Sequence, residues 1–355
     1  MTKHYKTSSH VNPGYRSDID GLRAVAVMLV VLYHFDVKAL SGGFVGVDIF
    51  FVISGFLITR IIANELHDGS FQFKNFWSRR IKRLLPASLT MVLVVLLVFS
   101  LVFPSALLQD VAKSSVSQFF FVSNIYFWSG AGYFEVASNL KPLLHTWSLS
   151  VEEQFYFIFP FYLFLMHRLQ PTFLMGLTML LTIGSFVFCV ILYNYETSGA
   201  FFWLPTRAWE LGTGACLALM ANKLYPRNST IALIATATGL LLVIGTALTF
   251  TKLTPFPSYF AMLPVAGTAL ILWGNSNLKN SLRTLFCLKP FVFIGLISYS
   301  LYLWHWPIKV LMDWYSVPLD HTSMCVIALL ATLCISTLSY YLIEQPFRVT
   351  RQRGI

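Results

Sequence analysis

Charged side chains are scarce in this sequence. Only 11% of its 355 residues are charged, whereas 56% are hydrophobic, and the mean hydropathy is positive. In an ordinary soluble domain about a quarter of the residues are charged. Water alone cannot solvate such a chain. The shortage of charge therefore excludes a set of soluble domains and favours a single helical membrane domain.

Several other features are missing as well. The five cysteines show no CxxC or CxxxH spacing and mostly lie in or beside apolar runs, so we interpret them as packing residues and expect neither a metal site nor a disulfide framework. No small-residue cleavage site follows the first apolar segment, which predicts a retained span and not a signal peptide. The net charge of +10 comes from basic residues in loops between apolar segments, a pattern that sets membrane orientation and does not indicate nucleic-acid binding.

A membrane-spanning helix needs about 20 mostly apolar residues. Eleven segments approach this requirement, at 22–38, 44–63, 84–103, 111–128, 147–166, 172–194, 201–220, 229–250, 258–275, 290–312 and 323–343. The fourth segment differs from the others because it carries Lys113, Gln118, Asn124 and several serines. Exposing these side chains to lipid would be costly.

The distribution of Lys and Arg decides whether this fourth segment crosses. If 111–128 does not cross, seventeen basic residues lie on one side and five on the other; if it does, the count becomes eleven on each side. The excess of Lys and Arg marks the cytoplasmic side. We therefore predict an all-α bundle of ten spans with both termini cytoplasmic. Residues 104–146 then form an external or re-entrant segment, which is tolerated where it lines a cavity.

Ionisable residues within spans are costly and indicate partners or function. Arg23 and His34 are eleven residues apart, so they share one helix face with His34 roughly 16 Å nearer the outer surface. Asp48 follows the SGGFV hairpin at a distance that places it at the depth of His34. A histidine beside carboxylates is a common general base.

Other ionisable residues follow in later spans. The ten-span topology predicts that Glu152, Glu153 and His305 also lie at outer depth, while Arg207 and Glu210 are spaced to pair across one helix turn. These residues could equally be satisfied structural groups that hold the bundle together.

On the predicted inner side, FWSRRIKRLLP concentrates Arg79, Arg80, Lys82 and Arg83. Such a patch either contacts anionic lipid or binds phosphate, which suits the arginine fork. An inner phosphate site and an outer histidine cluster suggest that a chemical group is transferred across the membrane from one to the other. A flippase or proton-coupled transporter, or a scaffold whose arginines bind only lipid, would show much the same distribution.

Seven segments form a recognisable series along nearly the whole chain: YRSDIDGLRAVAVMLVVLYHF, GGFVGVDIFFVISGFLITR, FWSRRIKRLLPA, HTWSLSVEEQFYFIFP, RAWELGTG, ISYSLYLWHWPI and YYLIEQPFR. In content and order they resemble the acyltransferase-3 family of bacterial membrane acetylases. The resemblance implies an acyltransferase-3 domain over residues 21–346, between a cytoplasmic tail at 1–20 and a basic cytoplasmic tail at 347–355. It also implies the bacterial inner membrane as the location.

The resemblance further implies an O-acetyltransferase. Its donor would be cytoplasmic acetyl-coenzyme A, as co-substrate and without a metal, and its acceptor a hydroxyl of a periplasmic or extracellular glycan, or lipid-linked glycan, such as lipopolysaccharide O-antigen. The opening motifs are similar to the subgroup that often carries an SGNH domain, so the chain is either a stand-alone member or the membrane half of a longer protein.

The family's motifs assign roles to individual residues. Its arginine-x10-histidine motif falls on Arg23 and His34, and its RxxR motif on Arg80 and Arg83. Its SxxE motif ends at Glu153, or at Glu152 one residue earlier, as the surrounding match favours. From these motifs and the ionisable residues of the spans together, we predict catalytic His34, Glu152 and Asp48, cofactor-binding Arg23, Arg80 and Arg83, and a substrate path through His145, Glu153, Arg207, Glu210 and His305.

Overall fold

The computed structural model describes residues 15–130, 138–221, 224–278, 280–315 and 320–349. The predicted tails at 1–20 and 347–355 therefore lie partly outside the described residues. Within them the chain forms helices and short connections, without a β-strand, as predicted. The helices are α1 (Ser17–His34), α2 (Gly46–His67), α3 (Phe73–Val102), α4 (Ser105–Phe119), α5 (Ser123–Ser129), α6 (Thr146–Leu169), α7 (Leu174–Tyr193), α8 (Thr197–Phe202), α9 (Leu204–Met220), α10 (Ser229–Thr249), α11 (Met262–Gly274), α12 (Ser281–Phe286), α13 (Lys289–Leu296), α14 (Ser298–Tyr315), α15 (His321–Ser339) and α16 (Gln345–Val349).

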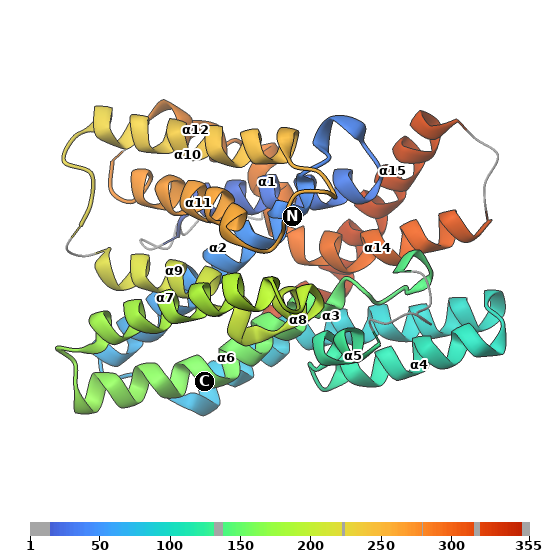
Figure 1. Cartoon of the computed structure of the whole chain (residues 1–355), viewed down its shortest axis with the longest axis horizontal. Helices are drawn as coiled ribbons and strands as arrows, with labels where there is room; N and C mark the ends of the chain where they lie inside the picture. The colour runs from blue at the N-terminus through green and yellow to red at the C-terminus, as the bar shows by residue number, and fades with distance from the viewer. Residues whose placement is uncertain (1–14, 131–137, 222–223, 279, 316–319, 350–355) are drawn as a thin grey trace, which may run out of the picture.

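Most of the long helices run along one common direction, which is horizontal in Figure 1. Buried apolar side chains fill the space between them in three groups. One group joins α3, α6 and α14, a second joins α1, α2, α9, α10 and α11, and a third joins α1, α14 and α15. Helix α1 contributes to two of these groups and packs against α2, α13 and α14. Two of its neighbours, α2 and α14, carry further cavity-lining residues described below.

Helices α2 and α9 approach each other so closely that glycine is required at their contact. A Cβ atom at Gly55 would lie 1.9 Å from the carbonyl oxygen of Leu211, and one at Gly214 would lie 2.0 Å from that of Val52. Small residues at helix interfaces are typical of membrane bundles because they let backbones pack directly. The contact fixes α2 against α9, and each of these helices supplies ionisable residues to the site described below.

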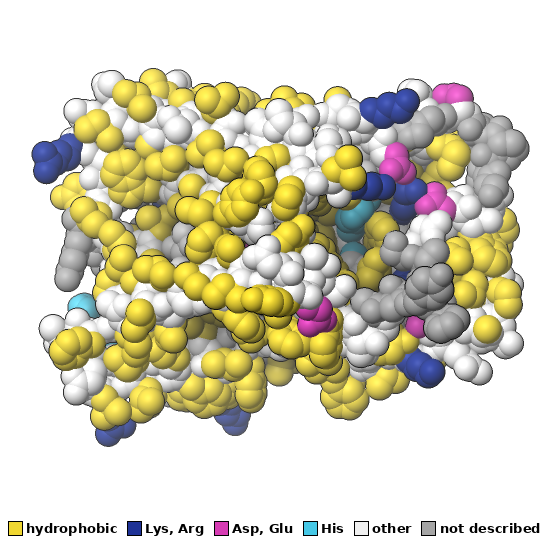
Figure 2. All heavy atoms as spheres, in the orientation of Figure 1, with side chains coloured by type: hydrophobic (Ala, Val, Ile, Leu, Met, Phe, Trp, Pro, Cys, Tyr) yellow, Lys and Arg dark blue, Asp and Glu magenta, His cyan; other side chains and the backbone are white. Residues whose placement is uncertain are grey.

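The outer surface of the bundle is largely apolar. Large hydrophobic side chains such as Leu93, Leu97 and Leu101 on α3, and Leu180 and Ile183 on α7, are exposed. Figure 2 shows apolar side chains over most of one face. An apolar exterior of this kind is suited to lipid, so the protein is a membrane-embedded helical bundle.

The predicted count of ten spans is not confirmed. Among the described residues, five helices are long and apolar enough to cross a bilayer, and α13 with α14, bent by 66° relative to each other, would make a sixth. Helices α1 and α6 carry ionisable residues such as Asp18, Asp20, Glu152 and Glu153, and α9 has only 17 residues. A criterion of length and apolar composition therefore does not count them. Ten crossings remain a prediction.

The polar fourth segment, predicted not to cross, forms two helices instead of one. Helix α4 ends at Phe119, and the chain turns through Phe121, whose φ is +54°, before α5 begins. Gln118 donates to Ser88 of α3, and the Ser123 hydroxyl bonds to Ser150 of α6 at 2.8 Å. The polar face of the segment is thus turned into the protein and away from lipid.

Candidate functional site

Two cavities lie toward opposite ends of α1. We call one the histidine cavity, of about 320 Å³, which is lined by residues that include His34, Asp48, His145, Arg207, Lys252 and Trp306. We call the other the arginine cavity, of about 490 Å³, which is lined by residues that include Arg16, Arg23, Arg60, Arg80, Arg83, Glu152, Glu153 and Arg348. Val47 and Tyr302 line both cavities, so the two adjoin at these side chains.

Three histidines from three helices meet at the histidine cavity. His34 is the last residue of α1, His305 lies within α14, and His145 precedes α6. The Nδ1 atom of His34 lies 2.9 Å from Nε2 of His305, and the two rings are stacked with centroids 5.1 Å apart. His145 packs edge-on against His305 at 5.5 Å. Figure 2 shows histidine side chains in a hollow of the surface, with basic and acidic side chains beside it.

The hydrogen bonds of His305 determine which nitrogen of His34 can act as a base. Nδ1 of His305 lies 2.7 Å from the carbonyl oxygen of Tyr302, which can only accept, so this Nδ1 carries the proton. In neutral His305 the other nitrogen, Nε2, must then accept, and the donor is the Nδ1–H of His34. A neutral His34 is thereby left with its lone pair on Nε2. The arrangement prepares His34 Nε2 to take a proton or attack a carbonyl carbon.

Arg207 lies beside this cavity between two buried carboxylates. Its guanidinium forms ion pairs with Asp48 Oδ1 at 2.8 Å and with Glu210 Oε1 at 2.8 Å, and all three side chains are at most 1% exposed. Four aromatic rings surround the guanidinium, with centroids 5.5–5.8 Å away. The predicted pairing of Arg207 with Glu210 is confirmed. The Asp48 carboxylate, expected near His34, lines the same cavity but is bound to Arg207 from α9.

Acidic and aromatic side chains hold the arginine groups of the second cavity in place. Arg80 bonds to Glu153 at 3.2 Å and stacks over the ring of Tyr156 at 3.4 Å. The Glu152 carboxylate accepts a hydrogen bond from Ser54 at 2.6 Å and another from Tyr156. Both carboxylates therefore already have partners in the arginine cavity.

Two further arginines line this cavity, and only one of them forms an ion pair. Arg23 lies 3.5 Å from Asp20, which also accepts from the Tyr15 hydroxyl at 2.6 Å. Burial and this carboxylate raise the pKa of Tyr15, so the hydroxyl stays protonated. Arg83, by contrast, has no ion-pair partner in the described part of the chain and lies among Arg23, Arg80 and Arg348. Its guanidinium is available for an anion.

The structure separates Glu152 and Glu153 from the histidines, contrary to the expectation that they share the depth of His34. Both line the arginine cavity, and neither contacts His34. Glu152 is six residues beyond Thr146, about 9 Å along α6. His34 and Asp48, in contrast, lie at or near the ends of their helices. Helix direction alone therefore placed the two glutamates too near the outer end.

Most of the remaining predicted residues line one of the two cavities. His34, Asp48, His145 and Arg207 line the histidine cavity, and His305 contacts it through His34. Arg23, Arg80 and Arg83 line the arginine cavity. Glu210 lines neither cavity but forms an ion pair with Arg207.

Sequence reasoning missed Tyr302, which lies between the two cavities and orients His305. Its place in the motif SYSLYLWHWPI, three residues before His305, was the signal that could have found it. The spacing puts the Tyr302 carbonyl within reach of the His305 ring on the same helix. Sequence reasoning also missed Arg16 and Arg60 as lining residues of the arginine cavity.

Comparison with known proteins finds one family and several relatives of this chain. The sequence model of a family described as "Acyltransferase domain" matches residues 16–341. "Peptidoglycan O-acetyltransferase OatA" of Listeria monocytogenes is 35% identical over 97% of this chain and 57% of its own length. "O-acetyltransferase OatA" of Staphylococcus aureus is 33% identical over 98% of this chain and 60% of its own length. The chain thus spans less than two thirds of these relatives, and no solved structure matches it.

Proposed function

The chain belongs to the acyltransferase-3 family, and from this premise we propose that it is a membrane O-acyltransferase whose donor binds in the arginine cavity and whose acceptor hydroxyl enters the histidine cavity. The observation that carries the proposal is the hydrogen-bonded chain from the Tyr302 carbonyl through His305 to His34. This chain leaves His34 Nε2 as a base or nucleophile at the cavity where the acceptor would lie.

Acyl-coenzyme A, probed as acetyl-coenzyme A, is the proposed donor. Its pyrophosphate requires positive charge, which Arg23, Arg80 and Arg83 supply at one end of the bundle. Its pantetheine arm is long and flexible, and the arginine cavity extends from Arg16 and Arg60 to Ser54 and Tyr302. These features support a donor whose phosphates stay among the arginines while its thioester reaches the layer formed by Val47 and Tyr302.

The acyl transfer can follow either of two routes, and each conserves atoms and charge. In the direct form, His34 Nε2 takes the proton of the acceptor hydroxyl, the oxygen forms a bond to the acyl carbon, and the carbon–sulfur bond breaks. In the covalent form, Nε2 attacks the acyl carbon first and releases the thiolate, and the hydroxyl oxygen then displaces the imidazole. In both forms the hydroxyl proton finally protonates the thiolate of coenzyme A.

For the acceptor we propose a hydroxyl of peptidoglycan. One relative is named a peptidoglycan O-acetyltransferase, which supports peptidoglycan over the lipopolysaccharide O-antigen expected from the motifs. The relatives are longer than this chain, so delivery to the glycan through a further domain, of SGNH type, is part of the proposal. We also propose the bacterial cytoplasmic membrane as the location, with both termini on the cytoplasmic side, from the distribution of Lys and Arg.

The proposal is tested by release of free coenzyme A from radiolabelled acetyl-coenzyme A, with the purified protein and peptidoglycan fragments. A transporter or flippase has no reason to cleave the thioester. We expect His34→Ala to lower this release by a factor of about 10² to 10⁴, the usual contribution of a general base. His167→Ala is the matched control, because His167 lies in the last turn of α6 and does not line either cavity. Full activity of a well-folded His34→Ala protein would refute the proposal.

A further inference from the structure

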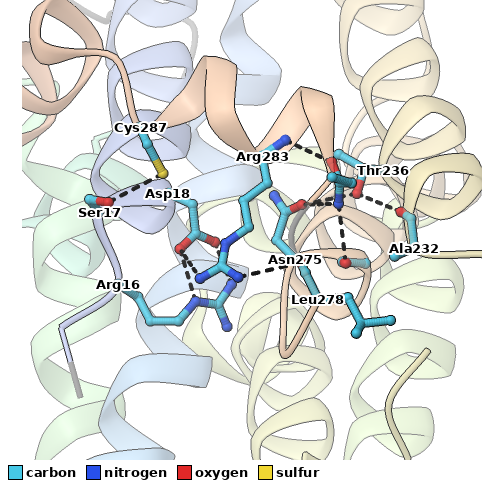
Figure 3. Close-up of polar contacts among 11 residues, drawn as sticks. Arg16, Ser17, Asp18, Ala232, Thr236, Asn275, Leu278, Arg283 and Cys287 are labelled. Atoms are coloured by element: carbon cyan, nitrogen blue, oxygen red, sulfur yellow. Dashed lines mark hydrogen bonds and ion pairs between the residues drawn. The ribbon is translucent and has the colours of Figure 1, made fainter. Parts of the chain in front are cut away.

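A second group of arginines lies toward one end of the arginine cavity, apart from Arg80 and Arg83. Arg16 precedes α1, Arg60 lies in the second half of α2, and Arg283 comes from the short helix α12. Arg16 and Arg60 line the cavity. Figure 3 shows Arg16 and Arg283 converging on Asp18 from opposite sides.

Positive charge exceeds negative charge in this group. Arg16 binds Asp18 with two hydrogen bonds, of 3.0 and 2.5 Å, and Arg283 lies 3.7 Å from the same carboxylate. Arg60 lines the same cavity as Arg16, lies within electrostatic reach of Asp18, and forms no ion pair with any described residue. Arg16 and Arg283 thus share one carboxylate and Arg60 has no ion-pair partner, so the three guanidinium groups carry two positive charges more than Asp18 balances.

The group is held in place by uncharged contacts as well. Asn280 caps α12 by accepting from the backbone N–H of Arg283 at 2.7 Å, and its amide donates to Asn275 at 3.1 Å. Asn275 in turn accepts from Thr236 of α10 at 3.1 Å, as Figure 3 shows. Arg283 is therefore fixed beside Asp18 by a network that reaches α10. By sharing Asp18, it reduces the negative charge that Asp18 presents to Arg16.

The two arginine groups lie at different depths. Arg16 is seven residues before Arg23, about 10 Å along the direction of α1. Arg60 is six residues beyond Ser54, and so about 9 Å farther than Ser54 from the residues that join the two cavities. Arg80 pairs with Glu153, next to Glu152, which binds Ser54, so Arg80 lies near the level of Ser54. Arg83 follows Arg80 by about one turn of α3. The group of Arg16 and Arg60 therefore lies farther from Tyr302 than the group of Arg23, Arg80 and Arg83.

Coenzyme A carries its phosphates in the same order. The pyrophosphate follows the pantetheine arm, and a 3′-phosphate lies beyond it on the ribose. We infer that Arg16 and Arg60 form a subsite for this 3′-phosphate, while Arg23, Arg80 and Arg83 face the pyrophosphate. A phosphomonoester with close to two negative charges matches the two uncompensated positive charges. The inference rests on the proposed donor and narrows it to 3′-phosphorylated acyl-coenzyme A, as opposed to an acyl-phosphopantetheine.

The test compares binding of coenzyme A and 3′-dephospho-coenzyme A to the purified chain, by calorimetry in nanodiscs of phosphatidylcholine. We expect the wild type to bind coenzyme A about tenfold more tightly, as the loss of one charge-assisted hydrogen bond predicts. Arg60→Gln should weaken binding of coenzyme A by the same factor and leave dephospho-coenzyme A unchanged. The matched control is Arg79→Gln, because Arg79 pairs with Glu65 and does not line the cavity.

Different failures have different meanings. Equal binding of both ligands by the wild type, a result that needs no variant, overturns the subsite but leaves the donor in place. An equal loss of both ligands in Arg60→Gln also overturns the subsite. Absence of binding by either ligand overturns the proposed donor itself. If phosphatidylglycerol in the nanodisc abolishes the difference between wild type and Arg60→Gln, the arginines hold lipid headgroups and the subsite is again refuted.

Discussion

The Tyr302 hydroxyl lies 2.5 Å from the Ser148 hydroxyl, at the junction of the two cavities. The same phenol donates to the carbonyl oxygen of His145 at 2.9 Å, so two bonds to neighbouring residues of one segment fix the ring. Tyr302 also contributes the carbonyl that orients His305. One residue thus both separates the cavities and sets the hydrogen-bond direction at the histidines.

Removing this side chain should open the layer between the cavities. We expect Tyr302→Ala to admit water to the thioester, so that release of coenzyme A without a glycan acceptor rises severalfold relative to transfer. Tyr302→Phe keeps the ring and should show no such rise, but it loses the two hydroxyl bonds and about 1 kcal/mol of stability for each. Both rates are measured with radiolabelled donor. Unchanged hydrolysis in Tyr302→Ala would show that the ring does not form the barrier.

His305 should act as a positioning residue for His34. We expect His305→Ala to lower kcat about a hundredfold with little change in KM for the donor, because the proposed donor site is in the other cavity. His305→Gln restores a hydrogen-bond acceptor and should recover part of kcat. A purely structural role predicts instead that both variants lose thermal stability and donor affinity together.

The cluster of Asp48, Arg207 and Glu210 should be essential for stability. Arg207→Met leaves two buried carboxylates without a cation, and breaking such a buried pair costs about 3–5 kcal/mol. We expect a large fall in the unfolding temperature of the detergent-solubilised protein. Arg168→Met, at the exposed end of α6, is the control and should unfold like the wild type. Similar unfolding of both variants would contradict the assignment.

The close contact between α2 and α9 should tolerate no side chain at Gly55. In Gly55→Ala the added methyl group meets the Leu211 backbone, so a shift of the helices is required and overpacking costs about 1–3 kcal/mol. Gly184→Ala on α7 meets no atom within 4 Å and should be neutral or slightly stabilising. Thermal unfolding compares the two variants directly. Equal stability would mean that the helices separate at little cost.

Much of the fold could be predicted because apolar length determines where membrane helices form. The predicted segments at 172–194 and 229–250 correspond closely to Leu174–Tyr193 and Ser229–Thr249. The bend of 66° between α13 and α14 was missed, since both helices lie in one apolar run with no break in hydropathy. The start of α3 at Phe73 was missed for the opposite reason, because its first turns are basic.

The sequence predicted which residues lie at the candidate site better than it predicted which residues they bind. The helix spacing correctly brought His34 and Asp48 to one cavity, and Arg207 to Glu210. It could not show that Asp48 binds Arg207 or that Glu153 binds Arg80, because these pairs join helices far apart in sequence. Depth along separate helices is an imprecise guide when each helix starts at a different level.

The shared boundary at Val47 and Tyr302 also has an electrical consequence. Where water fills both cavities, a voltage between the two ends of the bundle falls mainly across this thin layer and not along the full helices. In the proposed transfer a neutral thioester becomes a neutral thiol on one side of the layer, and a neutral hydroxyl becomes a neutral ester on the other. The acyl group and the proton cross in opposite directions, so the completed reaction moves no net charge. Its equilibrium should therefore be independent of the membrane potential, unlike that of an ion that crosses the layer alone.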